Sequence, residues 1–184
     1  MKVFFTASKE GQQYFDFYYQ QILSFLDKEN YENSNKDYFN NINKSRNLDV
    51  KDQNILFKLL IDKIHKSDIC IFECSFNSIT VGFLIEKALE IDKPVIALHL
   101  ENHTPEFLSG IDNDKFQLIE YTKTNLTKIM PNAIIKASLH ADKRFNFFVS
   151  SNMLIYLNKI SRSLGITKST FIRNLIEEYR KNHP

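Results

Sequence analysis

The sequence predicts an α/β domain with a doubly wound parallel sheet of four or five strands, followed by a small C-terminal unit of one strand and two helices. Apolar runs of strand length alternate with helical stretches, which is typical of a parallel sheet. The run at 69–72 is apolar at every position, as in a central strand buried on both faces. The pattern changes after residue 140, so we expect domains at 1–140 and 141–184.

The composition excludes several classes of protein. Of 184 residues 43% are hydrophobic, which is enough for a core, and the net charge of +2 means that any nucleic-acid contact must be local. Cys70 and Cys74 are four residues apart on an expected strand, too far from each other for a disulfide. We find no leader, no membrane-spanning run, no metal-ligand set and no cofactor motif, and we expect a cytoplasmic protein.

The first strand, loop and helix form the start of an α/β unit. A short apolar strand at Lys2–Thr6 leads through a small-residue turn at 7–11 into an amphipathic helix. Backbone amides at the start of such a helix favour an anion, so Ser8, Lys9 and Gly11 are candidate phosphate-binding residues. The aromatic residues at the start of this helix are interpreted as core and interface, not as a surface on which a base stacks: Tyr14, Phe15, Tyr18 and Tyr19.

The elements that follow are expected in alternation. Residues 29–49 are polar and are predicted to form a long surface loop, with a short strand or helix near Tyr38 and Phe39. The next helix, capped by Asp49 or Asp52, has a predicted buried stripe of Ile55, Leu56, Leu59, Leu60 and Ile64. The remaining elements are strand 69–72, helix 79–91, strand 94–100, a short helix at 104–110, strand 116–121 and helix 124–139.

Two polar residues follow the central strand directly. Glu73 and Ser75 lie at its carboxyl end, where open parallel sheets bind their ligands. Gly82 lies in the first turn of the next helix. We therefore expect Glu73, Ser75 and Gly82 to join Ser8, Lys9 and Gly11 in a nucleotide-binding site.

The stretch from Ser67 to Val95 also carries a resemblance. Its S-D-I-C-I-F-E-C-S run, its V-G-F box and its K-P-V ending are similar to the core of the nucleoside 2-deoxyribosyltransferase family, in particular the 2'-deoxynucleoside 5'-phosphate N-hydrolase branch. The opening F-F-T-A-S-K-E-G and the later L-S-G-I also fit that family. The resemblance spans residues 1 to about 130 and implies a Rossmann-like domain that binds a nucleotide.

The resemblance also implies two carboxylates that cleave the N-glycosidic bond. The position of the nucleophilic glutamate is Leu84 here, and the position of the helix aspartate is Leu60. Leucine has no group that attacks a sugar carbon, so we expect a domain that binds its ligand without cleaving it. The remaining weak catalytic candidates are Glu86, Glu73 and Asp62, and a serine and a glutamate at this spacing are also similar to NAD-cleaving TIR domains.

The C-terminal unit begins with an expected strand whose apolar face is Phe145, Phe147 and Val149. Ser150 or Ser151 caps a first helix, Gly165 ends it in a left-handed turn, and Thr167 starts a second helix. The apolar stripes are Met153, Leu154, Leu157, Ile160 and Leu164 in the first helix, and Phe171, Ile172, Leu175, Ile176 and Tyr179 in the second. Such a unit is too small to bury its own core, so we expect a two-fold dimer with paired strands.

This pattern, with its G-I-T-K-S turn, resembles the ribbon-helix-helix domains of the CopG/MetJ/Arc type. The resemblance implies a paired ribbon in the DNA major groove, with Arg144, Asn146 and Phe148 pointing outward. It also implies that the amides near Thr167, Lys168 and Ser169 hold a phosphate. The alternative is a ribbon that serves for dimerisation alone.

Three functions remain open from the sequence. The first is a dimeric DNA-binding regulator whose N-terminal domain binds a nucleotide-like ligand without cleaving it. The second is an active N-glycoside hydrolase, deoxyribosyltransferase or NAD-cleaving enzyme that uses the C-terminal unit as a dimerisation clip. The third is an antitoxin-like repressor whose N-terminal domain binds a partner protein.

Overall fold

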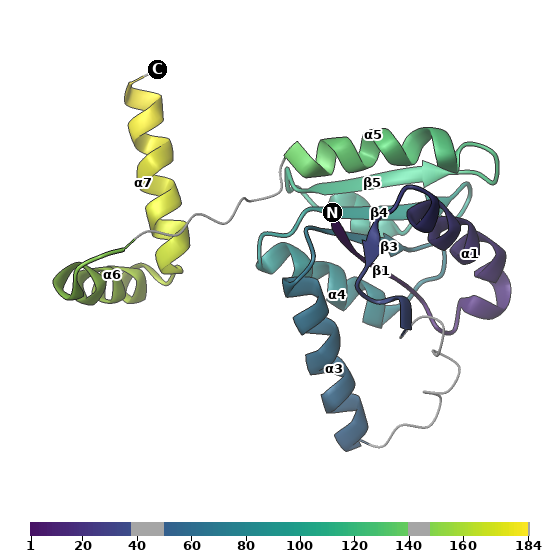
Figure 1. Cartoon of the computed structure of the whole chain (residues 1–184), viewed down its shortest axis with the longest axis horizontal. Helices are drawn as coiled ribbons and strands as arrows, with labels where there is room; N and C mark the ends of the chain where they lie inside the picture. The colour runs from purple at the N-terminus through teal and green to yellow at the C-terminus, as the bar shows by residue number, and fades with distance from the viewer. Residues whose placement is uncertain (38–49, 140–147, 184) are drawn as a thin grey trace. The chain divides into compact units, whose positions relative to one another are not determined.

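A computed structural model describes residues 1–37, 50–139 and 148–183 of the chain (Figure 1). The chain divides into two units, 1–142 and 143–184, and each is described by itself. The expected strand around Phe145 and Phe147, with Arg144 and Asn146, lies outside the described residues, as do Tyr38 and Phe39.

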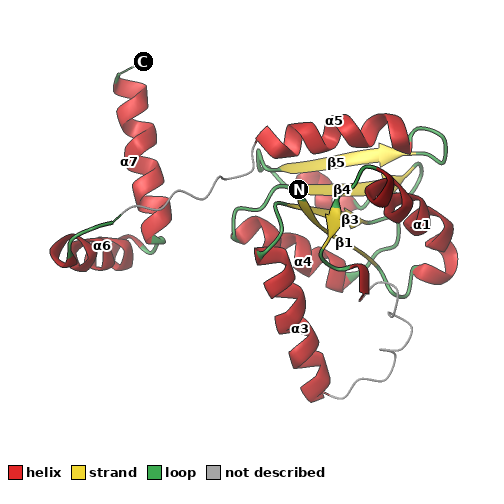
Figure 2. Cartoon of the chain, viewed as in Figure 1, coloured by secondary structure: helices red, strands yellow, loops and turns green. Residues whose placement is uncertain are grey.

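The first unit is an α/β domain with a five-stranded, all-parallel sheet in the order β2-β1-β3-β4-β5. The strands are β1 (Lys2–Ala7), β2 (Glu32–Asn33), β3 (Ile69–Glu73), β4 (Val95–Leu100) and β5 (Phe116–Tyr121). The helices are α1 (Gln12–Lys28), α3 (Val50–His65), α4 (Ile79–Glu90) and α5 (Leu126–Leu139), with a 3₁₀ helix, η2 (Glu106–Gly110), after β4. Strand order and connections are those of a Rossmann-like fold, as expected (Figure 2).

Helices cover both faces of the sheet. Because successive side chains of a strand point to opposite faces, alternate residues of each strand enter different cores. On one face, Val3 and Phe5 of β1 and Ile71 of β3 pack with the buried sides of α1 and α5. On the other face, Phe4 and Phe72 pack with α3 and α4. β3 lies in the middle of the sheet and is buried at all five positions, which confirms the interpretation of its apolar run.

Helix α3 differs from its prediction. Leu60 and Ile64 are buried, but Ile55 and Leu59, which the predicted stripe places in the core, are exposed. Figure 1 shows the N-terminal half of α3 extending beyond the sheet. Ile55 lies in the half of α3 that extends beyond the sheet, whereas Leu59 is roughly 100° around the helix from the buried Leu60.

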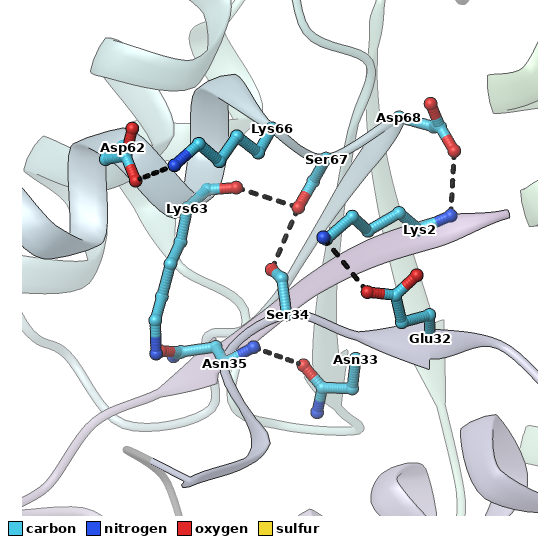
Figure 3. A network of polar contacts seen from close by, with 10 residues as sticks. All are labelled: Lys2, Glu32, Asn33, Ser34, Asn35, Asp62, Lys63, Lys66, Ser67 and Asp68. Atoms are coloured by element: carbon cyan, nitrogen blue, oxygen red, sulfur yellow. Dashed lines mark hydrogen bonds and ion pairs between the residues drawn. The ribbon is translucent and has the colours of Figure 1, made fainter.

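Strand β2 is a second difference, because the sequence predicts a loop at 29–49. β2 pairs with β1 only at Lys2–Glu32 and Val3–Asn33. After β2, the chain stays beside β1 through two further hydrogen bonds. The Ser34 amide donates to the Val3 carbonyl (2.9 Å), and the Asn35 side-chain amide donates to the Phe5 carbonyl (3.1 Å). Asn35 is fully buried, and Figure 3 shows it between Lys63 and Asn33.

The second unit contains α6 (Ser151–Leu164) and α7 (Lys168–Asn182). The Ser150 hydroxyl caps α6 by accepting from the Met153 amide, and the Thr167 hydroxyl caps α7 by accepting from the Thr170 amide. Gly165 has φ of +66°, the left-handed conformation expected at the end of α6. The caps and the turn between the helices thus lie where the sequence predicts them.

Candidate functional site

The candidate site of the first unit lies where β1 and β3 meet. These neighbouring strands are followed by helices on opposite faces, since α1 packs in one core and α4 in the other. The loops at the carboxyl ends of two such strands diverge, and ligands of open parallel sheets bind in the resulting crevice. The loops here are residues 8–11 after β1 and 74–78 after β3.

An open pocket of about 530 Å³ occupies this position. Its lining residues are Tyr14, Phe15, Ser75, Phe76, Asn77 and His103. The rings of Tyr14 and Phe76 are nearly parallel, with centroids 6.2 Å apart, and the His103 ring meets Phe15 edge-on at 5.1 Å. The pocket therefore offers aromatic surface together with a few polar groups, a combination suited to a flat heterocyclic ring.

Tyr14 corrects the interpretation of the aromatic residues at the start of α1. Tyr19 is buried in the core as predicted, but the Tyr14 side chain is 66% exposed and lines the pocket. Five residues separate Tyr14 from Tyr19, so the two side chains point roughly 140° apart around α1. Tyr14 lies in the first turn of α1, directly after the loop that follows β1, and this position is the sequence signal that places it at the site.

Glu73 is fully buried under the loop that carries Ser75. Its Oε1 accepts hydrogen bonds from the Ser75 hydroxyl, from the Ser75 amide (3.3 Å) and from the Tyr121 hydroxyl (3.1 Å). Ser75 lies in the loop after β3, while Tyr121 ends β5, 48 residues away in the sequence. The cluster therefore joins the carboxyl ends of β3 and β5 beneath the pocket.

Burial raises the pKa of Glu73 to about 7, although its hydrogen bonds with Ser75 and Tyr121 oppose the shift. The pKa values of Tyr19 and Tyr121 are raised for the same reason, burial, and secondarily by the nearby Glu73 carboxylate. Burial also raises the pKa of the Cys74 thiol, with Glu73 as a smaller cause. Glu73 is thus a carboxyl group that gains or loses its proton near neutral pH.

The loop after β1 holds Ser8, Lys9 and Gly11, the candidate phosphate-binding residues. Two amides at the start of α1 already have partners within the loop: that of Gly11 donates to the Ser8 hydroxyl (3.1 Å), and that of Gln12 donates to the Lys9 carbonyl (3.3 Å). The Ser8 hydroxyl donates to Glu10 (3.1 Å). A phosphate at this loop would have to displace these bonds, and the use of the three residues for an anion stays a prediction.

A second cavity of about 460 Å³ lies beside the first, between the start of α4 and η2. The two cavities share Phe76 and Asn77 as lining residues. Gly82 lines the second cavity, and a Cβ at Gly82 would meet no atom within 4 Å. Its rim carries two almost fully exposed apolar side chains, Ile79 and Phe107. Gly82 thus lines the neighbouring cavity and not the one that Ser75 lines, and its part in a nucleotide-binding site stays a prediction.

The two positions where the resemblance expects carboxylates lie in the core. Leu84 is 3% exposed and Leu60 is 5% exposed, and both belong to the cluster under α3 and α4. Glu86 is exposed on α4, and Asp62 is exposed on α3, paired with Lys66 at 2.6 Å. Neither Glu86 nor Asp62 lines either cavity. Among the described residues, no group of three or more His, Cys, Asp or Glu side chains is placed to hold a metal ion.

The candidate DNA-binding residues of the second unit are described in part. Phe148 is fully exposed, while Arg144 and Asn146 lie outside the described residues. At the start of α7, Lys168 donates to Asn158 of α6 (3.1 Å) and Ser169 is exposed. Thr167 and Ser169 thus lie at the exposed N-terminus of α7, and their contact with a phosphate stays a prediction.

No protein-family model matches the sequence, and no curated protein matches it. None of the helices in residues 1–37, 50–139 and 148–183 combines the length and apolar character needed to cross a membrane.

Proposed function

We propose that this chain is a dimeric DNA-binding regulator whose N-terminal unit binds a nucleotide-like ligand without cleaving it. The observation that carries the proposal is the apolar surface of α6 and α7. Their exposed apolar side chains are Met153, Leu154, Ile155, Tyr156, Leu164, Leu175, Ile176 and Tyr179. Leu157 is the apolar side chain that α6 buries, and α7 buries none.

Dimerisation gives this surface a partner. Burying an aliphatic side chain contributes roughly 1.5–3 kcal/mol, so leaving this many of them in water is costly for a two-helix unit. A second copy of the same unit supplies a matching surface by two-fold symmetry. The strand–helix–helix order and the G-I-T-K-S turn favour the ribbon-helix-helix arrangement, in which the paired strands contact DNA.

The first unit supports binding without cleavage. Leu84 and Leu60 fill the core where the resemblance requires acids, and Glu73 is enclosed beneath the pocket. The pocket at the β1–β3 crevice nevertheless keeps aromatic rings and polar groups at its surface. A ligand that binds more tightly to the DNA-competent form of the dimer would raise its affinity for DNA by the same factor.

An electrophoretic mobility shift assay tests the proposal directly. The full chain is titrated onto DNA from upstream of its own coding region, with a shuffled fragment of equal length as control, and the assay is repeated with nucleosides and nucleotides. We expect a shift of the first fragment at lower protein concentration than the second, and a change in the midpoint with ligand. Equal binding to both fragments would contradict specific DNA recognition.

A turnover assay tests the absence of cleavage. The chain is incubated with deoxynucleosides, their 5'-monophosphates and NAD, and free base or nicotinamide is measured by chromatography. We expect none above a protein-free control. Release of base that is abolished by Glu86→Ala would instead establish the enzymatic alternative.

A further inference from the structure

The hydroxyl of Ser75 has one donor and two lone pairs, and the structure accounts for most of them. Its proton is donated to Oε1 of Glu73. One lone pair accepts the amide of Leu100, at 2.8 Å. Ser75 lines the pocket and is 7% exposed, so a ligand that reaches its hydroxyl would meet a lone pair. Ser75 can therefore accept a hydrogen bond from a ligand but cannot donate one without breaking its bond to Glu73.

The protonation of Glu73 does not release the Ser75 proton. Oε1 of Glu73 accepts from the Ser75 hydroxyl, the Ser75 amide and the Tyr121 hydroxyl, whereas Oε2 takes part in none of these three bonds. A proton bound by this carboxyl group is therefore placed on Oε2, and Oε1 remains an acceptor. The other ionisable groups that face the carboxyl are Tyr19 and Cys74. Both stay neutral near pH 7 because burial raises their pKa values.

We propose that Ser75, held by Glu73, makes the pocket select a heterocyclic ring whose edge donates a hydrogen bond, such as an amino-substituted base, over the same ring with a carbonyl group there. This inference rests on the proposed function, which assigns a nucleotide-like ligand to the pocket. A carbonyl oxygen at that edge would face the Ser75 lone pair and leave both acceptors without a donor, which costs free energy in a partly buried site.

The other lining residues fit this assignment. Tyr14 and Phe76 offer ring faces for stacking, and Asn77 and His103 each have both donor and acceptor capacity. Asn77 and His103 therefore adapt to either kind of ring edge, which leaves Ser75 as the residue that discriminates. None of the six described residues that line this pocket is lysine or arginine, and the contacts proposed here are with the ring and its edge.

Isothermal titration with two matched pairs of nucleosides tests the inference. Adenosine and inosine differ by an amino group in place of a carbonyl group, and so do cytidine and uridine. In both pairs the adjacent ring nitrogen also changes, from an acceptor in the amino member to an N–H donor in the carbonyl member. Because one hydrogen bond is gained and one repulsion avoided, we expect the amino member of at least one pair to bind about tenfold more tightly. In Ser75→Ala this preference should fall to about one, while Ser163→Ala, an exposed serine of α6, should keep it.

The outcomes separate the inference from the proposed function. Equal affinity within both pairs, or a preference for the carbonyl member, would overturn the inference and leave the nucleotide-like ligand in place. Absence of binding by all four nucleosides would overturn the ligand class itself, and the inference with it. Preference retained in full by Ser75→Ala would assign the selection to another residue. If Ser75→Ala fails to fold, the affinities of the paired nucleosides for the unchanged chain still test the inference.

Discussion

Gly11 and Phe76 are in direct contact across the β1–β3 crevice. A Cβ at Gly11 would lie 2.6 Å from the Cβ of Phe76 and 2.6 Å from the hydroxyl oxygen of Tyr19. The absence of a side chain at Gly11 thus lets the loop after β3 pack against the start of α1. This contact fixes Phe76, which lines both cavities of the first unit.

Gly11→Ala is therefore expected to lower the free energy of unfolding by about 1–3 kcal/mol, because the new methyl group overpacks a closed contact. Gly82→Ala is the matched control: a Cβ there meets no atom within 4 Å, and alanine favours a helix over glycine by about 0.5–1 kcal/mol. Urea denaturation measures both. Equal stability of the two variants would contradict the close contact at Gly11.

Glu73 should make the stability of the chain depend on pH. Its pKa is raised from 4.5 to about 7 in the folded state, so the folded chain holds the proton more tightly than the unfolded chain. The stabilisation is complete below about pH 4.5 and is lost as the pH rises through 7. We expect a fall of about 3 kcal/mol in the free energy of unfolding across this range.

Glu73→Gln should remove this dependence, because the neutral amide keeps an oxygen for Ser75 and Tyr121 and has no proton to lose. Unfolding by urea at pH 5 and at pH 8 measures the effect. Glu86→Gln, at an exposed position of α4, is the control and should follow the unchanged chain. A Glu73→Gln chain with the same loss of stability between pH 5 and pH 8 would contradict the assignment.

The exposed face of α7 should be required for assembly. Ile176 is 63% exposed, so Ile176→Asp costs little in an isolated unit but places a charge in the proposed dimer interface. We expect this variant to be monomeric at micromolar concentrations in analytical ultracentrifugation. Asn174→Asp, two residues away on the other side of the helix, should remain dimeric. A monomeric unchanged chain would contradict the dimer.

The predicted ribbon residues should separate specific from general DNA binding. If Arg144 contacts a guanine edge, Arg144→Ala should weaken binding to the specific site by about 1–3 kcal/mol and leave binding to shuffled DNA nearly unchanged. Lys168→Ala should weaken both by a similar factor, because a phosphate contact carries no sequence information. Fluorescence anisotropy on the two fragments checks this. Equal loss on both fragments for Arg144→Ala would favour a non-specific contact.

The elements that the sequence predicts well are those with local signals. β3 has a continuous apolar run, and Gly165 and Thr167 carry the turn and the cap between α6 and α7. β2 was missed because two polar residues, Glu32 and Asn33, have no apolar alternation. The pairing of β2 with β1 depends on Lys2 and Val3, which are distant in sequence.

In the candidate site too, residues with a local sequence signal are predictable, and residues placed by distant parts of the chain are not. Glu73 and Ser75 lie at the carboxyl end of a central strand, as predicted, but Ser75 lines the pocket whereas Glu73 is buried beneath it. Tyr121 was not expected there, because its hydroxyl reaches Glu73 only when β5 takes its place two strands away. Tyr14 is interpreted from the sequence as a core and interface residue, but its side chain is exposed, roughly 140° around α1 from the buried Tyr19.

The side chain of Asn35 has a consequence for the behaviour of the chain in concentrated solution. β1 pairs with only two residues of β2, and Asn35 continues that edge because its side-chain amide donates to the Phe5 carbonyl. A sheet edge that is held in this way is expected to be less open to pairing with another molecule. Asn35→Ala should scatter more light than the unchanged chain on storage at high concentration, and an equally clear solution would show that other residues guard this edge.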